Sequence, residues 1–189
     1  MTLPIGELLV ILVLTLVSAV FVAAEIALVS IRRSRVEQLV EERRRGALRV
    51  QRLTADPGRF LAVVQLCLTF VGFFASAYAA VSLVDLLGSL LATVPALRES
   101  ADAIALVVVT ALLSLFTIVF GELVPKSVAL AHPEGIATFL AAPIDLIGRL
   151  LSPIVWLLTA TTRVVASALG ANVAAESRIS AEELRLIVE

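Results

Sequence analysis

The sequence is poor in the residues that build redox, zinc and nucleic-acid sites. Its 189 residues include one cysteine, Cys67, one histidine, His132, and one lysine, Lys126. A lone cysteine cannot form an intrachain disulfide, and without a CxxC motif or a Cys/His cluster neither a zinc nor an iron–sulfur site is expected. We interpret Cys67, which lies in an apolar run, as a small packed side chain. The net charge of −1 offers no basic excess for a nucleic-acid partner.

Apolar residues are what the chain has in excess. They make up 60% of the sequence, and the mean hydropathy is +1.04. Soluble domains are about 45–50% apolar, so an excess carried in long runs indicates contact with lipid. The apolar start, residues 1–31, is not expected to be a cleavable signal peptide, because no basic segment precedes it and the run is too long.

The pattern predicts an all-α membrane protein with three transmembrane helices plus short juxtamembrane or interfacial helices. About 20 apolar residues span the hydrocarbon core. The predicted spans are residues 8–31, 60–87 and 103–131. The remaining segments are an amphipathic surface helix at 36–53, a loop at 88–102, and short helices at 136–169 that lie in the interface or enter the membrane part-way. Whether 136–169 crosses is left open.

The chain is predicted to hold one transmembrane domain, residues 1–175, followed by the start of a truncated cytosolic helical region, residues 176–189. Ser180 is a good N-cap, and Glu182 and Glu183 follow in the first turn. The helix that they begin is cut off at Glu189, which suggests a piece of a longer protein.

Arginine placement predicts the orientation. The segment between the first two spans, residues 32–59, carries nine arginines, whereas the next loop carries only Arg98. By the positive-inside rule the arginine-rich segment is cytoplasmic, which places the N-terminus outside and, after three crossings, the C-terminus in the cytoplasm. The alternative interpretation of these arginines as a solvated helix face also leaves the segment on the cytoplasmic side.

Polar residues recur at similar depth in the three predicted spans. At about 1.5 Å per residue, Glu25 and Gln65 lie roughly 10 Å from the cytoplasmic boundary, and Thr69 and Glu122 roughly 15 Å from it. Lipid cannot satisfy such groups, so these polar faces are expected to turn inward. Carboxylate, amide and hydroxyl oxygens suit hard cations, which leaves Mg²⁺, Ca²⁺ and Na⁺ open.

The segment 121–126 adds a backbone ligand to this set. Pro125 has no N–H, so the carbonyl of Gly121 loses its usual helical partner, and Gly121 itself allows another group to approach. Transporters commonly build midplane ion sites from such interrupted helices. Two plainer interpretations stay open. Glu122 and Lys126 are an i,i+4 pair that could simply neutralise each other. Gly72 is followed by small residues at every fourth position, a pattern that could serve helix packing.

Three stretches resemble the transmembrane domain of the CorC/cyclin-M (CNNM) family of magnesium transporters. They are FVAAEIALVS at 21–30 followed by RRSR, DPGRFL at 56–61 leading to TFVG at 69–72, and FGELVPKS at 120–127. Members of this family are typically dimers that export Mg²⁺ from the cytoplasm, with proposed coupling to Na⁺ entry. Their membrane domain has three crossing helices and short juxtamembrane helices, and nucleotide-binding CBS domains normally follow.

The resemblance implies a multi-pass homodimeric Mg²⁺ exporter of the cell (inner or plasma) membrane that works by alternating access. Its expected metal ligands are Glu122, Gly121, Glu25, Thr69 and Gln65, with Pro125, Lys126 and Gly72 in supporting roles. A membrane scaffold or regulatory domain with a structural polar core is the main alternative. Catalysis is not expected, because no motif places a nucleophile beside a base.

Overall fold

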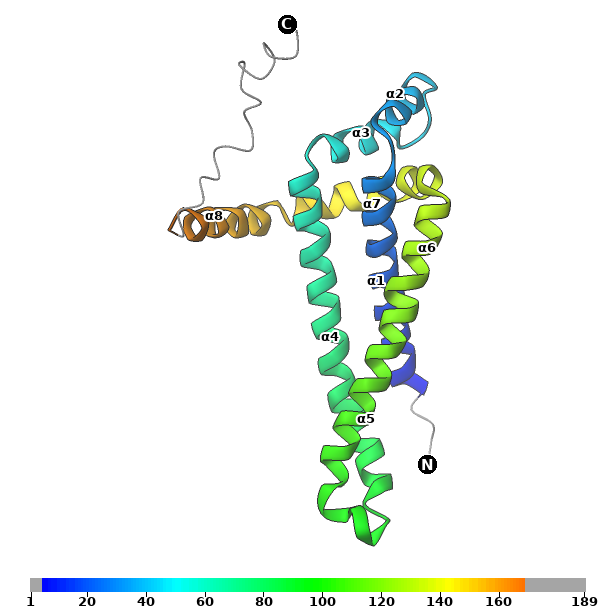
Figure 1. The fold of residues 1–189 in the computed structure, drawn as a ribbon, viewed down its shortest axis with the longest axis vertical. Helices are drawn as coiled ribbons and strands as arrows, with labels where there is room; N and C mark the ends of the chain where they lie inside the picture. Colours follow the sequence, from blue (N-terminus) through cyan, green and yellow to red (C-terminus); the bar gives the residue numbers. More distant parts are fainter. Residues whose placement is uncertain (1–4, 169–189) are drawn as a thin grey trace, which may run out of the picture. The chain divides into compact units, whose positions relative to one another are not determined.

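The computed structural model describes residues 5–168, and the regular structure in that range is entirely helical (Figure 1). The chain divides into two units, Met1–Gly148 and Arg149–Glu189. Three segments are long and apolar enough to cross a membrane: Ile5–Ser30, Pro57–Leu91 and Pro95–Ala131. The predicted all-α fold with three spans is confirmed. The helix expected to begin at Ser180, and with it the boundary between 1–175 and 176–189, lies outside the described residues.

The first two spans are single helices, α1 (Ile5–Ser30) and α4 (Pro57–Leu91). The start of α4 is fixed by local chemistry. Pro57 occupies the first turn, where its missing N–H is not needed, and the side chain of Asp56 accepts a hydrogen bond from the backbone N–H of Arg59 at 3.1 Å. This cap makes α4 begin three residues before the predicted span, and the helix also runs further at its other end.

The third span is built from several pieces. A 3₁₀ helix, η1 (Pro95–Ser100), leads into α5 (Ala101–Phe116), then a π-helical segment, η2 (Thr117–Leu123), then α6 (Val124–Ala131). The loop predicted over 88–102 is wrong in part. Its first residues belong to the end of α4 and its second half is η1, because Pro95 is well suited to a helical first turn.

The amphipathic helix predicted over 36–53 is two helices, α2 (Arg33–Glu41) and α3 (Ala47–Ala55). The turn between them holds two residues with left-handed backbone conformation, Arg43 at φ 53° and Gly46 at φ 86°. A Cβ at Gly46 would collide with the backbone carbonyl of Thr138, so only glycine fits there. The apolar spacing across 36–53 belongs to two short helices that share one buried side.

Two more helices follow the third span, α7 (Pro133–Leu150) and α8 (Ser152–Ala168). They match the short helices predicted over 136–169. Pro143 lies inside α7 without ending it. The two helices would count as a fourth span only if this interrupted pair were taken as one crossing, so whether the segment crosses stays open.

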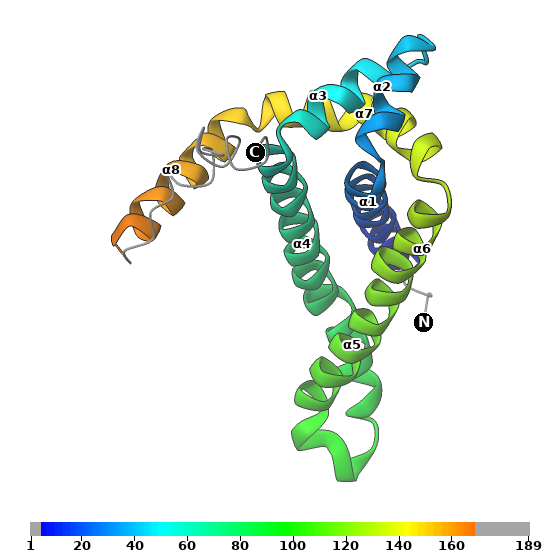
Figure 2. The same ribbon diagram turned by 45° about the horizontal axis from the view of Figure 1, so that its top comes forward.

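Within residues 5–148 the three spans pack around α1. Helix α1 contacts α4 along one side and η2 and α6 along another, and α4 packs closely on α5. Figures 1 and 2 show α4 and α6 separated at one end, with α1 between them. This arrangement places the third span's irregular segment against α1 rather than against α4.

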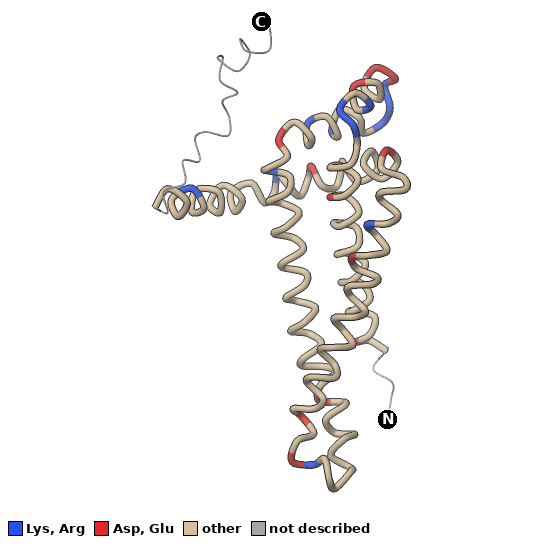
Figure 3. Tube along the Cα trace, viewed as in Figure 1, with Lys and Arg blue, Asp and Glu red and all other residues tan. Residues whose placement is uncertain are grey.

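Charge and packing distinguish the two ends of this unit. Lys and Arg gather where α2 and α3 lie, apart from Lys126 and Arg98 (Figure 3). We call this the basic end, and the region where α4 turns into α5 the hairpin end. The basic end holds one buried apolar cluster from α1, α2, α3, α4, α6 and α7. A smaller cluster from α1, α4 and α5 lies towards the hairpin end.

Candidate functional site

The third span contains a π-helical segment at the place where the sequence predicted an interruption. In η2 the backbone widens to an i→i+5 pattern, and the N–H of Val124 donates to the carbonyl of Val119. Pro125 has no N–H to offer the carbonyl of Gly121 in the usual i→i+4 pattern. The predicted irregularity is therefore present, but it takes the form of a widened turn that continues into α6 rather than an opened helix. Such turns occur frequently at functional sites.

Gly121 lies where η2 packs against α1. It is buried, and a Cβ built there would lie 3.3 Å from the Cγ2 of Thr117 and 3.4 Å from the Cγ2 of Thr15. A Cβ there would thus fit against α1 with little room to spare, and a bulky side chain would not fit without a shift. The hydroxyl of Thr15 donates to the carbonyl of Ile11 at 2.9 Å, so it is satisfied within α1, as expected for a threonine in a membrane helix.

Glu122 and Lys126 form an ion pair next to this turn. The Nζ of Lys126 lies 2.6 Å from the Oε1 of Glu122, and the side chains are 37% and 48% exposed, respectively. The pair brings two opposite charges together inside a span, where an isolated charge costs roughly 2.5–3.5 kcal/mol. The Glu122 carboxylate is thus paired with the ammonium of Lys126, and both side chains remain partly exposed.

Glu25 lies on α1, the helix that contacts η2 and α6. Its neighbours Ala24, Ala27 and Leu28 are buried, while Glu25 itself is half-buried. Within residues 5–168 its carboxylate has no ion-pair or hydrogen-bond partner. It is a partly buried carboxylate without a counter-charge, on the helix that joins the other two spans.

The polar face of α4 points away from the other spans. Gln65, Thr69, Gly72 and Ser76 are all exposed, and the Gln65 Nε2 donates to the Thr69 Oγ1 at 3.4 Å. The expectation that all three polar faces turn into one interior is wrong for α4 within the single chain. The reason is that α1 lies between α4 and the η2–α6 segment, so α4 meets α1 and α5 with its apolar and small residues.

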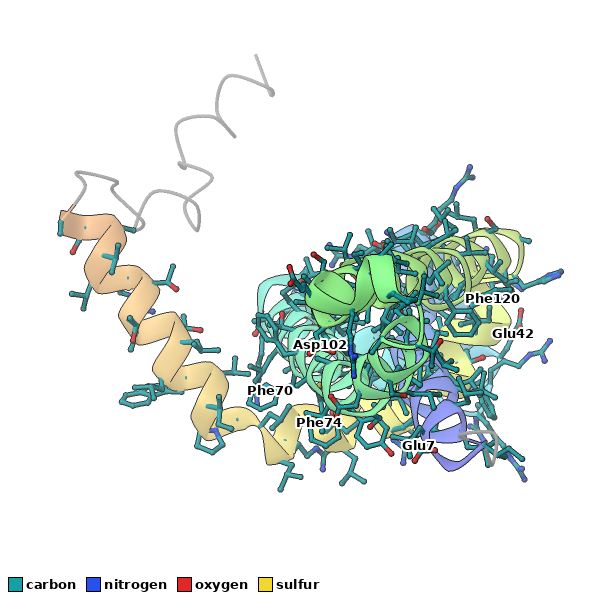
Figure 4. All side chains as sticks on the ribbon, turned by 90° about the horizontal axis from the view of Figure 1, so that it is seen from below. Glu7, Glu42, Phe70, Phe74, Asp102 and Phe120 are labelled. Carbon is teal, nitrogen blue, oxygen red and sulfur yellow. The ribbon has the colours of Figure 1, made fainter. Side chains whose placement is uncertain are left out.

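Within residues 5–168 no three His, Cys, Asp or Glu side chains come close enough to share a metal ion. The structure brings Gly121 and Glu122 next to α1, and it pairs Gln65 with Thr69, but it does not join these two groups. The exposed face of α4 also carries large apolar side chains. Phe70, Phe73 and Phe74 are 70%, 73% and 61% exposed, and Phe70 and Phe74 lie on the opposite side of the bundle from Phe120 (Figure 4).

Comparison with known proteins assigns the family. Residues 8–189 match the CNNM family, described as the cyclin M transmembrane N-terminal domain. The chain belongs to the CNNM family.

Relatives of this CNNM domain come from several bacteria. It is 34% identical over 183 residues to the UPF0053 protein sll0260 of Synechocystis, a match that covers 97% of the chain and 41% of that protein. It is 32% identical over 177 residues to the UPF0053 inner membrane protein YfjD of Escherichia coli, covering 91% and 37%. It is 28% identical over 182 residues to a polyamine export protein of Haemophilus influenzae, covering 95% and 41%. The chain thus spans about two-fifths of the length of these relatives.

Two ion pairs at the basic end of the CNNM domain were not anticipated from the sequence. The guanidinium of Arg35 on α2 contacts both carboxylate oxygens of Glu134 on α7, at 2.8 and 3.0 Å. The Nη1 of Arg52 on α3 donates to the Oδ2 of Asp145 at 3.2 Å, and the Asp145 side chain is only 11% exposed. Together they tie α2 and α3 to α7.

The Arg35–Glu134 ion pair shifts the pKa of both side chains. The hydrogen bond from Arg35 holds the pKa of Glu134 below its ordinary value, and the same hydrogen bond raises the pKa of Arg35. A sequence signal for the Arg52–Asp145 pair did exist, because Asp145 is an acid in the apolar stretch between Thr138 and Gly148, and a buried acid needs a partner. Its partner could not be identified, since nine arginines precede it within residues 32–59.

Proposed function

We propose that this CNNM domain carries cations across the cell membrane by alternating access, with Mg²⁺ exported from the cytoplasm as the cargo. The observation that carries the proposal is the Glu122–Lys126 pair beside the π-helical turn of the third span. A carboxylate that is held by an internal lysine can exchange that lysine for an arriving cation without ever standing unpaired in lipid. One relative is named a polyamine export protein, and polyamines are themselves cations.

The proposed site is centred on η2. Glu122 supplies the charge and Gly121 a backbone carbonyl, to which Pro125 has no N–H to offer in the usual i→i+4 pattern. Glu25 on the adjacent helix supplies a second carboxylate nearer the basic end, because Gly121 lies against Thr15, roughly 15 Å along α1 from Glu25. Lys126 occupies Glu122 when the site is empty and withdraws when a cation binds. All of these groups are oxygen donors or control one, which suits a hard cation.

Gln65 and Thr69 enter this proposal through a second copy of the chain. Exposed polar side chains in a span are costly in lipid, and the α4 face that carries them also carries three exposed phenylalanines. A homodimer that covers this face shields Gln65 and Thr69 from lipid, and Gly72 allows two helices to approach closely there. Gln65 and Thr69 then face the partner within that interface, on the far side of α1 from Glu122.

Orientation follows from the basic end. With nine arginines on residues 32–59, that end faces the cytoplasm and α1 begins outside. Na⁺ entry is the proposed driving reaction, and cytosolic CBS domains are the proposed continuation of the chain beyond Glu189.

The test measures Mg²⁺ flux into liposomes that contain this chain, its Glu122→Gln variant, or Glu99→Gln as an exposed control on η1. Flux in the parent and in Glu99→Gln, lost in a folded Glu122→Gln, supports the carrier. Full flux in Glu122→Gln refutes the site. If no protein conducts, Mg²⁺ titration decides: a loss of affinity of about tenfold or more in Glu122→Gln supports the site. Absent binding in the parent favours a scaffold whose polar core is structural.

A polyamine is the second candidate cargo, because one relative at 28% identity is named a polyamine export protein. Its ammonium groups would pair with Glu122 and Glu25 in place of a metal ion. Uptake of labelled spermidine into the same liposomes distinguishes the two. Spermidine uptake that is lost in Glu122→Gln, without Mg²⁺ flux in the parent, points to the polyamine. Mg²⁺ flux without spermidine uptake points to the metal.

A further inference from the structure

A cavity of about 580 Å³ lies at the basic end, between the end of α1 and the start of α4. Its walls come from four successive segments: the last turn of α1, α2, α3 and the first turns of α4. Cavities that hold small molecules have volumes of about 300–1,000 Å³. Nothing in the proposed transport path uses this space, because its lining residues include none from η2 or α6.

The depth of the cavity is set by the ends of the spans. α1 ends at Ser30 and α4 begins at Pro57, so the apolar segments stop where the cavity lies. This is the level at which a bilayer changes from acyl chain to polar headgroup. A molecule in the cavity therefore meets both environments at once.

The lining is divided in the same way. Leu28, Val29 and Leu61, from the spans, form an apolar wall, whereas Arg33, Gln51 and Thr54, from α2 and α3, supply polar groups. A soluble ion would make no favourable contact with the apolar wall, and a hydrocarbon would leave the polar groups of the other wall without hydrogen-bond partners. The combination fits an amphiphile with a polar head and an aliphatic chain.

The charge of this region selects the sign of the head. The lining itself holds one arginine, Arg33, and one acid, Glu37, within a segment, residues 32–59, that carries nine arginines against four acids. Arg33 is 96% exposed and holds Glu37 by a single contact of 3.5 Å. An arginine pairs more strongly with a phosphate, through two parallel hydrogen bonds, than with one distant carboxylate oxygen. Arg33 can therefore exchange Glu37 for a phosphate without losing a buried partner.

We propose that an anionic phospholipid occupies this cavity, with its phosphate on Arg33 and the first part of an acyl chain against Leu28, Val29 and Leu61. The bound lipid fills the angle between α1, the α2–α3 pair and α4. This assignment is independent of the transport proposal, because it concerns neither Glu122 nor the ion.

Native mass spectrometry of the intact chain, released from detergent, tests this directly. Dioleoyl phosphatidylglycerol and dioleoyl phosphatidylcholine, which share their chains, are titrated in parallel. We expect phosphatidylglycerol to bind about tenfold more tightly, because phosphatidylcholine has the same phosphate but its ammonium group cancels that charge and is repelled by the surrounding arginines. Equal binding of the two lipids would overturn the proposal, and so would displacement of phosphatidylglycerol by millimolar inorganic phosphate, since the polar part alone would then suffice.

Two variants and two matched controls locate the site. Arg33→Gln removes the charge and should abolish the preference for phosphatidylglycerol, whereas Arg45→Gln removes an exposed arginine outside the cavity and should not. Ala55→Phe fills the cavity from its lining and should weaken both lipids, whereas Ala131→Phe, exposed at the end of α6, should weaken neither. Unfolding temperatures confirm that each variant folds. Parent-like lipid binding in both Arg33→Gln and Ala55→Phe would refute the site.

Discussion

The basic end and the hairpin end of the CNNM domain are held together in different ways. The basic end joins six helices in one buried apolar cluster, and two ion pairs tie α2 and α3 to α7. The hairpin end joins three helices around Ile11, Ala79, Val84, Ala105 and Val109. Part of the basic end lies beyond the spans, where burying apolar area is strongly favourable. Within lipid that driving force is missing, and close packing of small residues replaces it.

The proposed cation site lies outside the apolar clusters of both ends. Gly121 and Glu122 are on η2, which contacts α1 but belongs to neither cluster. Because the two ends are held together in different ways, substitutions there should differ in the size and in the kind of effect that they produce.

The largest effect is expected for Gly46→Ala at the basic end. Gly46 has φ 86°, and a Cβ there meets the backbone of Thr138, which cannot move aside as a side chain can. Strain and collision together should lower the free energy of unfolding by about 2–4 kcal/mol. Chemical unfolding in detergent measures it. Gly135→Ala is the control, because its Cβ meets nothing within 4 Å, and an equal loss in both variants would contradict the prediction.

Ala105→Leu at the hairpin end should lower the free energy of unfolding by a smaller amount. Ala105 is fully buried where α5 packs on α4, so a larger side chain has to push the two helices apart. Overpacking of this kind costs about 1–3 kcal/mol. Unfolding in detergent checks it against Ala103→Leu, which is exposed on the same helix and should change little. A harmless Ala105→Leu would show that the hairpin end is not closely packed.

Asp145→Asn should loosen the basic end by about 1 kcal/mol, because it weakens the hydrogen bond from Arg52 without leaving a cavity. The pair joins α3 to α7, so proteolysis in the α2–α3 turn should become faster as well. Asp56→Asn, an exposed cap at the start of α4, should leave that rate unchanged. The same proteolysis rate in Asp145→Asn and the parent would show that this tie does not hold α3 in place.

The smallest effect is a pH dependence from Glu134. Because Arg35 lowers the pKa of Glu134 in the folded state, its contribution is present above the unfolded pKa of about 4.3 and is lost as pH falls through the folded value. The difference in unfolding midpoint between the parent and Glu134→Gln should therefore shrink from pH 6 towards pH 3. Glu41→Gln, exposed on α2, should show no such trend. A difference that grows on acidification would contradict the assignment.

Local chemistry in the sequence was enough for several features. The three spans followed from apolar runs of sufficient length. The irregularity near Gly121 followed from Pro125, which cannot donate a hydrogen bond wherever the helix lies. The Glu122–Lys126 pair followed from its i,i+4 spacing.

Other features depend on which helix lies next to which. The division of 36–53 into α2 and α3 is decided by the close contact of Gly46 with Thr138 on α7, and the ion pairs of Arg35 and Arg52 need the same helix. The outward direction of Gln65 and Thr69 is decided by α1, which separates α4 from α6. Sequence by itself determined what each segment must be, because length, hydropathy and hydrogen bonding act within a segment. Only the tertiary structure decided which polar groups meet, because that depends on contacts between residues far apart in the sequence, such as Arg35 and Glu134, which are 99 positions apart.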